Sequence, residues 1–152
     1  MIAEAGVNHN GDLAVAKRLI QAARDAGSDA VKFQAFRADR LVTREAAKAG
    51  YQAEQTGPGG QFGMLKALEL SAAQFRQLSA QAEEEGIAFL ASPFDADSLA
   101  MLLELGVPAI KLGSGELTDL PLLRRAAQTG KPLLLSTGMA DEAEIAEALA
   151  AI

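Results

Sequence analysis

The chain has 152 residues, of which 49% are hydrophobic, and this is enough for one globular domain with a substantial core. No apolar run approaches the roughly 18 residues that span a bilayer, and no basic region followed by an apolar core marks a signal peptide. We therefore expect a cytoplasmic protein that does not enter a membrane. Because the chain contains no cysteine, disulfides, thiolate nucleophiles and zinc–thiolate sites are excluded.

The formal net charge is -6, so the protein is not expected to bind nucleic acid or an anionic membrane. An anionic ligand would have to be held by a few cations placed close to it. Lysines inside apolar strands are therefore the first residues to consider as ligand contacts.

The first predicted unit is a strand, a polar loop and a helix. Residues 2–7 form a short apolar run, and Asn-His-Asn-Gly follows at residues 8–11. Asp12 stands at the N-cap position of a helix whose apolar residues recur at three- and four-residue spacing. One face of that helix is expected to be buried.

This pattern recurs along the rest of the chain. Further strands are predicted at residues 29–36, 87–94, 109–116 and 132–139. The later helices follow residues that commonly cap helix N-termini, namely Ser71, Asp95 or Asp97, Asp119 and Asp141. The last helix runs to Ile152 without a stop signal, so we expect the domain to continue beyond it.

Apolar strands that alternate with amphipathic helices indicate a parallel sheet covered by helices. Two folds have this pattern, the doubly wound sheet and the (β/α)8 or TIM barrel. A doubly wound sheet usually carries one glycine-rich phosphate turn at its first crossover, whereas here every strand is followed by polar residues. We therefore predict an α/β protein in which residues 1–152 form about the first five units of a TIM barrel.

Residues 38–60 interrupt the alternation. The segment is polar, favours helix around residues 45–55, and contains Gly-Pro-Gly-Gly at residues 57–60. Insertions of this length commonly form lids over active sites or are disordered, and the sequence leaves both interpretations open.

Lys32 and Lys111 lie inside apolar strands, where a lysine is rarely buried without a partner. Each is able to pair with a buried carboxylate such as Glu4 or Glu116, or to extend its stem to solvent. Because both lysines lie near the C-terminal ends of strands, where barrel active sites form, we favour a role in binding an anion.

Hydroxyl side chains follow the strands in the same way, at Ser92, Ser114 and Ser136. A single serine at such a place is as often a turn or cap residue. Their repetition predicts a set of hydrogen-bond donors for phosphate oxygens.

Glu4 lies within the first strand, where a carboxylate without a partner is costly. It is a candidate for acid–base or metal-linked chemistry, or for a structural ion pair with one of the two lysines, and the two roles are compatible. His9, the only histidine, is a candidate to orient a neighbour, to bind substrate or to cap its loop. One histidine alone is weak evidence for a metal site.

Five motifs in this order resemble the sialic acid synthase family, which comprises N-acetylneuraminate synthases and their legionaminate and pseudaminate relatives. They are IAEAGVNHNGD (residues 2–12), DAVKFQAF (29–36), FLASPFDADS (89–98), AIKLGSGELTDLPLL (109–123) and KPLLLSTGM (131–139). The resemblance covers nearly the whole chain.

The resemblance implies a transferase that condenses phosphoenolpyruvate with an N-acetylated amino sugar, such as N-acetylmannosamine or a relative, and with water. The products would be a nine-carbon nonulosonic acid and phosphate, and a manganese or magnesium ion would polarise the sugar aldehyde. In this sequence the phosphoenolpyruvate contacts would be Lys32, Ser92, Lys111, Ser114 and Ser136, and the catalytic carboxylate would be Glu4. Asn8, His9 and Gln34 are further candidates without an assigned role.

The same resemblance places other parts of the enzyme beyond Ile152. These are two histidine ligands of the metal and an antifreeze-like domain that covers the active site of the partner in a homodimer. No metal ligand is therefore expected within residues 1–152, and this chain alone is expected to be inactive. Two alternatives remain open, a Schiff-base aldolase with a nucleophilic lysine and an inactive anion-binding fragment. The acceptor sugar is not determined by these residues.

Overall fold

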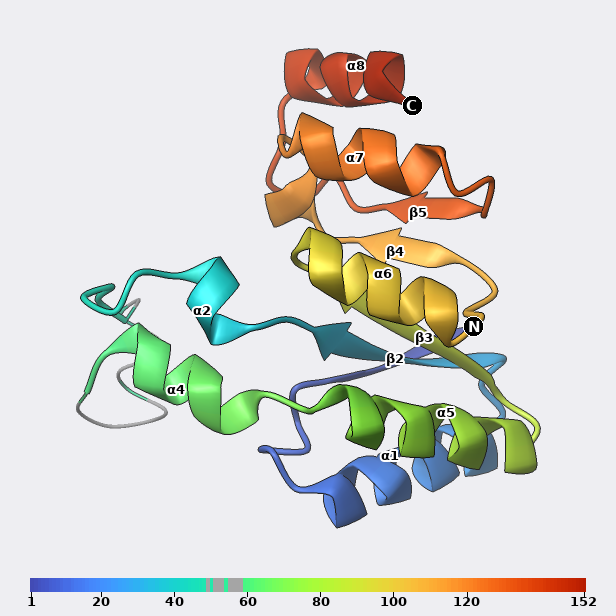
Figure 1. Cartoon of the computed structure of the whole chain (residues 1–152). Coiled ribbons are helices and arrows are strands. Elements are labelled where there is room, and N and C mark those ends of the chain that lie inside the picture. Colours follow the sequence, from blue (N-terminus) through green and yellow to red (C-terminus); the bar gives the residue numbers. More distant parts are fainter. Residues whose placement is uncertain (49, 51–53, 55–58) are drawn as a thin grey trace.

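The computed structural model describes residues 1–48, 50, 54 and 59–152, and it contains five parallel strands with helices packed against them (Figure 1). The strands are β1 (Ile2–Gly6), β2 (Ala30–Ala35), β3 (Ala88–Pro93), β4 (Ile110–Leu112) and β5 (Leu133–Leu135). The helices are α1 (Leu13–Asp25), α2 (Ala38–Leu41), α4 (Gln61–Leu68), α5 (Ala72–Glu84), α6 (Ala96–Glu104), α7 (Leu120–Ala127) and α8 (Glu142–Ala151), with a 3-10 turn η1 (Ser114–Glu116).

The strands lie in the order in which they occur in the chain. A parallel ladder joins β1 to β2 and β2 to β3, and a second ladder joins β4 to β5. Strand β4 lies beside β3 without a ladder between them (Figure 1). Because the order never reverses, the sheet lacks the switch point of a doubly wound fold and has the sequential winding of a barrel. The predicted barrel units are confirmed.

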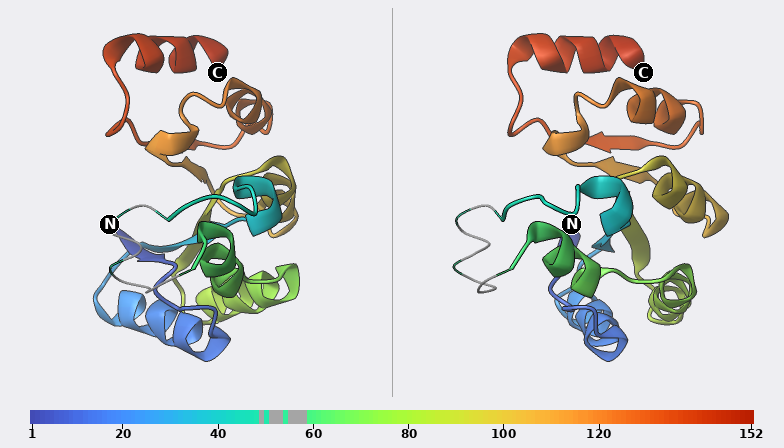
Figure 2. Two further views of the ribbon diagram at one scale, coloured as in Figure 1. Left: turned by 90° about the vertical axis from the view of Figure 1, so that its left-hand side faces the viewer. Right: turned by 60° about the vertical axis from the view of Figure 1, so that its left-hand side comes forward.

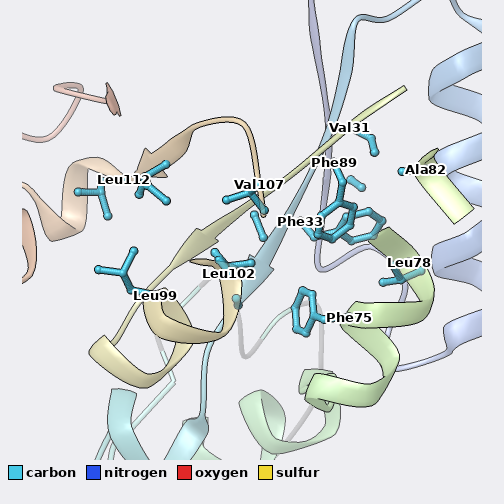
Figure 3. Packing of buried hydrophobic residues seen from close by; sticks show 14 of the residues in the cluster. Val31, Phe33, Phe75, Leu78, Ala82, Phe89, Leu99, Leu102, Val107 and Leu112 are labelled. Carbon is cyan, nitrogen blue, oxygen red and sulfur yellow. The ribbon is translucent and has the colours of Figure 1, made fainter. Parts of the chain in front are cut away.

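Helices cover one face of the sheet, as the views in Figure 2 show. On that face the aromatic rings of β2, β3 and α5 form the centre of the core (Figure 3). The Phe33 ring stacks on Phe89 with centroids 5.7 Å apart, and Phe75 meets Phe89 edge-on at 6.4 Å. The opposite face carries Glu4, Lys32 and Lys111, so the two faces of the sheet differ sharply in polarity.

The predicted helix caps are confirmed, and the structure resolves the choice between two of them. The Asp95 carboxylate accepts a hydrogen bond from the Ser98 amide, so Asp95 is the N-cap of α6 and Asp97 lies in its first turn. Ser71 and Asp141 each form a complete capping box. These bonds satisfy amide groups that have no partner within the helix.

Strands β4 and β5 are shorter than the sequence predicts. The strand expected at residues 109–116 ends at Leu112, and residues 114–116 form η1 instead. The strand expected at residues 132–139 ends at Leu135. Glycines at positions 113, 115 and 138 explain both differences, because glycine favours turns over extended ladders.

In the described part of the insertion between β2 and α5, helices α2 and α4 were not predicted from the sequence. Its two ends meet at Glu69, whose carboxylate accepts a hydrogen bond from the Ala38 amide at 2.5 Å and pairs with Lys66 at 3.0 Å. Of the stretch expected to favour helix, Gly50 and Glu54 are helical, Glu45 lies in a turn, and residues 49, 51–53 and 55 lie outside the described residues.

Within the described part of the chain, no helix is long and apolar enough to cross a membrane.

The capping box of α5 gives a test of this local structure. The substitution Ser71→Ala is expected to reduce the free energy of unfolding by about 1 kcal/mol, because the Gln74 amide loses its acceptor. The control Ser79→Ala lies inside the same helix and is expected to change stability by less than about 0.5 kcal/mol. Urea unfolding of the three proteins measures both values, and equal effects would contradict the capping role.

Candidate anion-binding site at the strand ends

The register of the parallel strands brings polar residues together on the face opposite the helices. Glu4 of β1 lies beside Lys32 of β2, and Gln34 of β2 lies beside Ser92 of β3. Residues that are level in neighbouring strands point to the same face, so these side chains share one surface. It lies toward the C-terminal ends of the strands, where barrel enzymes have their active sites.

Lys32 lies at the centre of the first group. Its Nζ is 2.5 Å from Glu4 Oε2 and donates a hydrogen bond to Ser92 Oγ at 3.4 Å. The lysine side chain is only 10% exposed, whereas the Glu4 side chain is 54% exposed. The structural ion pair that the sequence left open is therefore present, and the half-exposed carboxylate remains accessible for chemistry.

Lys111 lies at the centre of the second group. Its Nζ donates hydrogen bonds to Ser136 Oγ at 2.7 Å and to the Leu112 carbonyl at 2.6 Å. Burial lowers the pKa of Lys111, and the positive charge of Lys32 lowers it further, while Glu4 and Glu116 act in the opposite direction. The two lysines are thus close enough to repel each other. Both of the oxygens that Lys111 contacts are uncharged.

Glu116 belongs to this site, although the sequence suggested it only as a partner for a lysine. Burial raises the pKa of its carboxyl, while a hydrogen bond at the Gly113 backbone and the charge of Lys111 oppose that shift. A Cβ atom at Gly113 would lie 2.5 Å from Glu116 Oε2, so any side chain at that position would displace the carboxylate. The sequence signal was the acid that ends the Gly-Ser-Gly-Glu turn after β4.

Ser114 is the first residue of η1, the turn that ends with Glu116, and it is half-buried. Gln34 and Glu4 both lie close to Gly6. A Cβ atom at Gly6 would be 3.1 Å from Glu4 Oε1 and 3.9 Å from Gln34 Nε2. Asn8 is exposed just beyond β1.

His9 is not part of the polar surface. Its side chain is fully buried, and its ring lies 6.1 Å from the Phe33 ring, on the helix-covered side of the sheet. Burial lowers the pKa of His9. Of the candidates named from the sequence, the structure therefore separates His9 from the lysines and serines.

The described residues contain no group of three or more His, Cys, Asp or Glu side chains arranged to hold a metal ion. Glu4 pairs with a lysine, and Glu116 lies against the Gly113 turn and near Lys111. These two carboxylates do not make a metal site by themselves.

The chain as a whole is similar to known proteins. The chain is 48% identical over 150 residues to the N,N'-diacetyllegionaminic acid synthase of Campylobacter jejuni, covering 98% of this chain and 45% of that protein. It is 41% identical over 140 residues to human N-acetylneuraminate-9-phosphate synthase, and this match covers 91% of this chain and 39% of the human protein. The chain thus spans less than half the length of these relatives.

The fold has a close structural counterpart as well. The N-acetylneuraminic acid synthetase of Leptospira borgpetersenii, solved in complex with citrate, superposes with a TM-score of 0.83 at 35% identity. The match covers 99% of this chain and 48% of that one. The NeuB family profile matches residues 19–152. The chain therefore belongs to the NeuB family.

Proposed function

We propose that this chain supplies the phosphoenolpyruvate site of an enzyme that condenses phosphoenolpyruvate with an N-acetylated amino sugar and water. The products are a nonulosonic acid and phosphate. The observation that carries the proposal is the convergence of Lys32 of β2 and Lys111 of β4, each bonded to a serine hydroxyl, on one face of the sheet. The relatives named above are synthases of acids of this class.

The two lysines suit a ligand that carries both a carboxylate and a phosphate. Their mutual repulsion is relieved when an anion lies between them, and partial burial strengthens each contact relative to water. The hydrogen bonds of Lys111 go to neutral oxygens, so an anionic oxygen is a stronger acceptor that can replace them. Ser92, Ser114 and Ser136 add hydroxyl donors around the same space.

In the proposed reaction the methylene carbon (C3) of phosphoenolpyruvate forms a bond to the aldehyde carbon of the open-chain sugar, and the aldehyde oxygen takes up a proton. Water then adds at C2, the carbon that carries the phosphate, and loses a proton. Phosphate leaves with cleavage of its C2–O bond and takes the proton of the new C2 hydroxyl, which becomes the keto group. Glu4 is the candidate to carry these protons, because its carboxylate is half exposed and is oriented by Lys32. Glu116 is a second carboxyl on the same side.

By the family resemblance, the full-length enzyme would use a manganese or magnesium ion and form a homodimer. Its acceptor would be an N-acetylated amino sugar, and the related synthases named above make different acids from such sugars.

The first test uses a chimeric full-length synthase in which this chain replaces the matching segment of the Campylobacter jejuni relative. We expect phosphate release from phosphoenolpyruvate that depends on an N-acetylated amino sugar. Lys111→Met is expected to raise the KM for phosphoenolpyruvate about ten- to a hundredfold, since charged hydrogen bonds are lost. Lys131→Met is the matched control. Lys131 lies just before the N-terminal end of β5, whereas the site is at the C-terminal ends of the strands, so this substitution is expected to leave KM within about twofold. Equal effects of the two substitutions would contradict the assignment of the site.

The lowered pKa of Lys111 favours a second candidate, a Schiff-base aldolase. Treatment with pyruvate and borohydride separates the two. A reduced pyruvate adduct on Lys111 would support the aldolase, whereas phosphate release without an adduct supports the synthase.

The electrostatics of Lys111 can be measured directly on the 152-residue chain. Acylation of Lys111 is expected to accelerate at a lower pH than that of lysine in a model peptide, because only the uncharged amine reacts and burial lowers its pKa. Glu116→Gln is expected to move this rise to still lower pH, because the carboxylate raises the Lys111 pKa. Pulse labelling followed by peptide mass spectrometry gives the rates. A rise at the pH of the model peptide would show that Lys111 is not in this environment.

A further inference from the structure

The segment that joins β1 to α1 consists of tight turns, and it has one buried side chain, that of His9. Strand β1 contains an irregularity in which Glu4 pairs with Lys32 but Gly6 pairs with Phe33, so Ala5 has no opposite residue. Gly6, Asn10 and Gly11 all have positive φ, at 54°, 51° and 78°. Bulges next to active sites commonly redirect a side chain, and this one brings the Gly6 backbone against the Glu4 carboxylate.

His9 is the buried residue of the loop that follows this bulge. Its ring packs against Phe33, the residue opposite Gly6 in the register. Its Nδ1 accepts a hydrogen bond from the Gly11 amide at 2.9 Å, and its carbonyl accepts one from the Asp12 amide at 2.9 Å. The imidazole thus connects the bulge to the start of α1.

These contacts determine the protonation state of the ring. A backbone amide can only donate, so Nδ1 must be unprotonated and the neutral ring carries its proton on Nε2. Nε2 is buried and has no hydrogen-bond partner in the described part of the protein. An unpaired buried donor is a cost to stability, so retaining a polar ring here requires a reason other than packing.

The loop has little room to adjust. A Cβ at Gly11 would lie 2.3 Å from the Ala67 carbonyl of α4, so the Gly11 backbone is pressed against the insertion. The bond from its amide to His9 Nδ1 is what orients Gly11 toward that contact. Without His9 Nδ1 as acceptor, the turn at Gly11 and the β1 bulge before it would lose the bond that holds them in place.

We propose that His9 is a positioning residue, which in its Nε2-protonated form holds the loop and the β1 bulge so that Glu4 stays aimed at Lys32. This inference rests on the proposed function, because the group that His9 positions is the proposed proton carrier. His9 itself does not reach the polar surface.

Two substitutions separate the hydrogen bond from packing. His9→Phe keeps a ring against Phe33 and removes the acceptor, whereas His9→Asn retains an oxygen near the position of Nδ1. In the chimeric synthase, His9→Phe is expected to lower kcat about tenfold or more and to change the KM for phosphoenolpyruvate less than about threefold. His9→Asn is expected to recover most of the lost kcat.

Asp12→Ala is the matched control, because it removes the N-cap of α1 in the same loop without touching the bulge. It is expected to lower the melting temperature while leaving kcat within about twofold. If Asp12→Ala lowered kcat as much as His9→Phe does, His9 would have only a general stabilising role, and the inference would be overturned. An unchanged kcat in His9→Phe would also overturn it.

Two measurements on the 152-residue chain need no activity. Nitrogen NMR of the ring is expected to show a bare Nδ1 and a protonated Nε2 at neutral pH, and the Gly11 amide is expected to exchange slowly in the wild type and His9→Asn but fast in His9→Phe. A proton on Nδ1, or equal exchange in all three, overturns the inference. A chimera that releases no phosphate would instead contradict the proposed function, and the ring and exchange measurements would still decide whether His9 holds the loop.

Discussion

The parallel register of β1 and β2 places the Glu4 carboxylate beside the Lys32 ammonium, and the candidate site depends on this ion pair. A lysine that is 10% exposed is costly to charge without a partner, and the pair together with Ser92 supplies one. A slip of one residue between the strands would turn one partner to the opposite face. Because Glu4 remains half exposed, the pair avoids the full desolvation penalty of a buried salt bridge.

Lys111 brings a second positive charge to the same surface from the other ladder. The hydrogen-bonded sheet is interrupted between β3 and β4, so the two lysines belong to two ladders that meet without pairing. What holds these ladders together is apolar packing beneath them, where Leu99 and Leu102 of α6 lie in the same core as Phe89 and Leu112 (Figure 3). The core therefore keeps like charges close, in the arrangement that an anionic ligand requires.

Much of the fold could be anticipated because its signals are local. Asp12, Ser71 and Asp141 cap helices through contacts within three residues, and such contacts can be recognised in any sequence. The lysines stood out for a similar reason, since a charge in an apolar strand is visible without knowing its neighbours. The lengths of β4 and β5 were overestimated, because β-propensity does not reveal where a strand stops pairing with its neighbour.

The sequence by itself determined the alternation of strands and helices, the caps, and the candidate residues that follow each strand. Only the tertiary structure decided which of these residues meet. It paired Lys32 with Glu4, joined Lys111 to Ser136, added Glu116 to the site, and placed His9 on the apolar side against Phe33. The physical reason is that strand register and a backbone bulge assign each side chain to one face of the sheet, and both depend on contacts between segments distant in the chain.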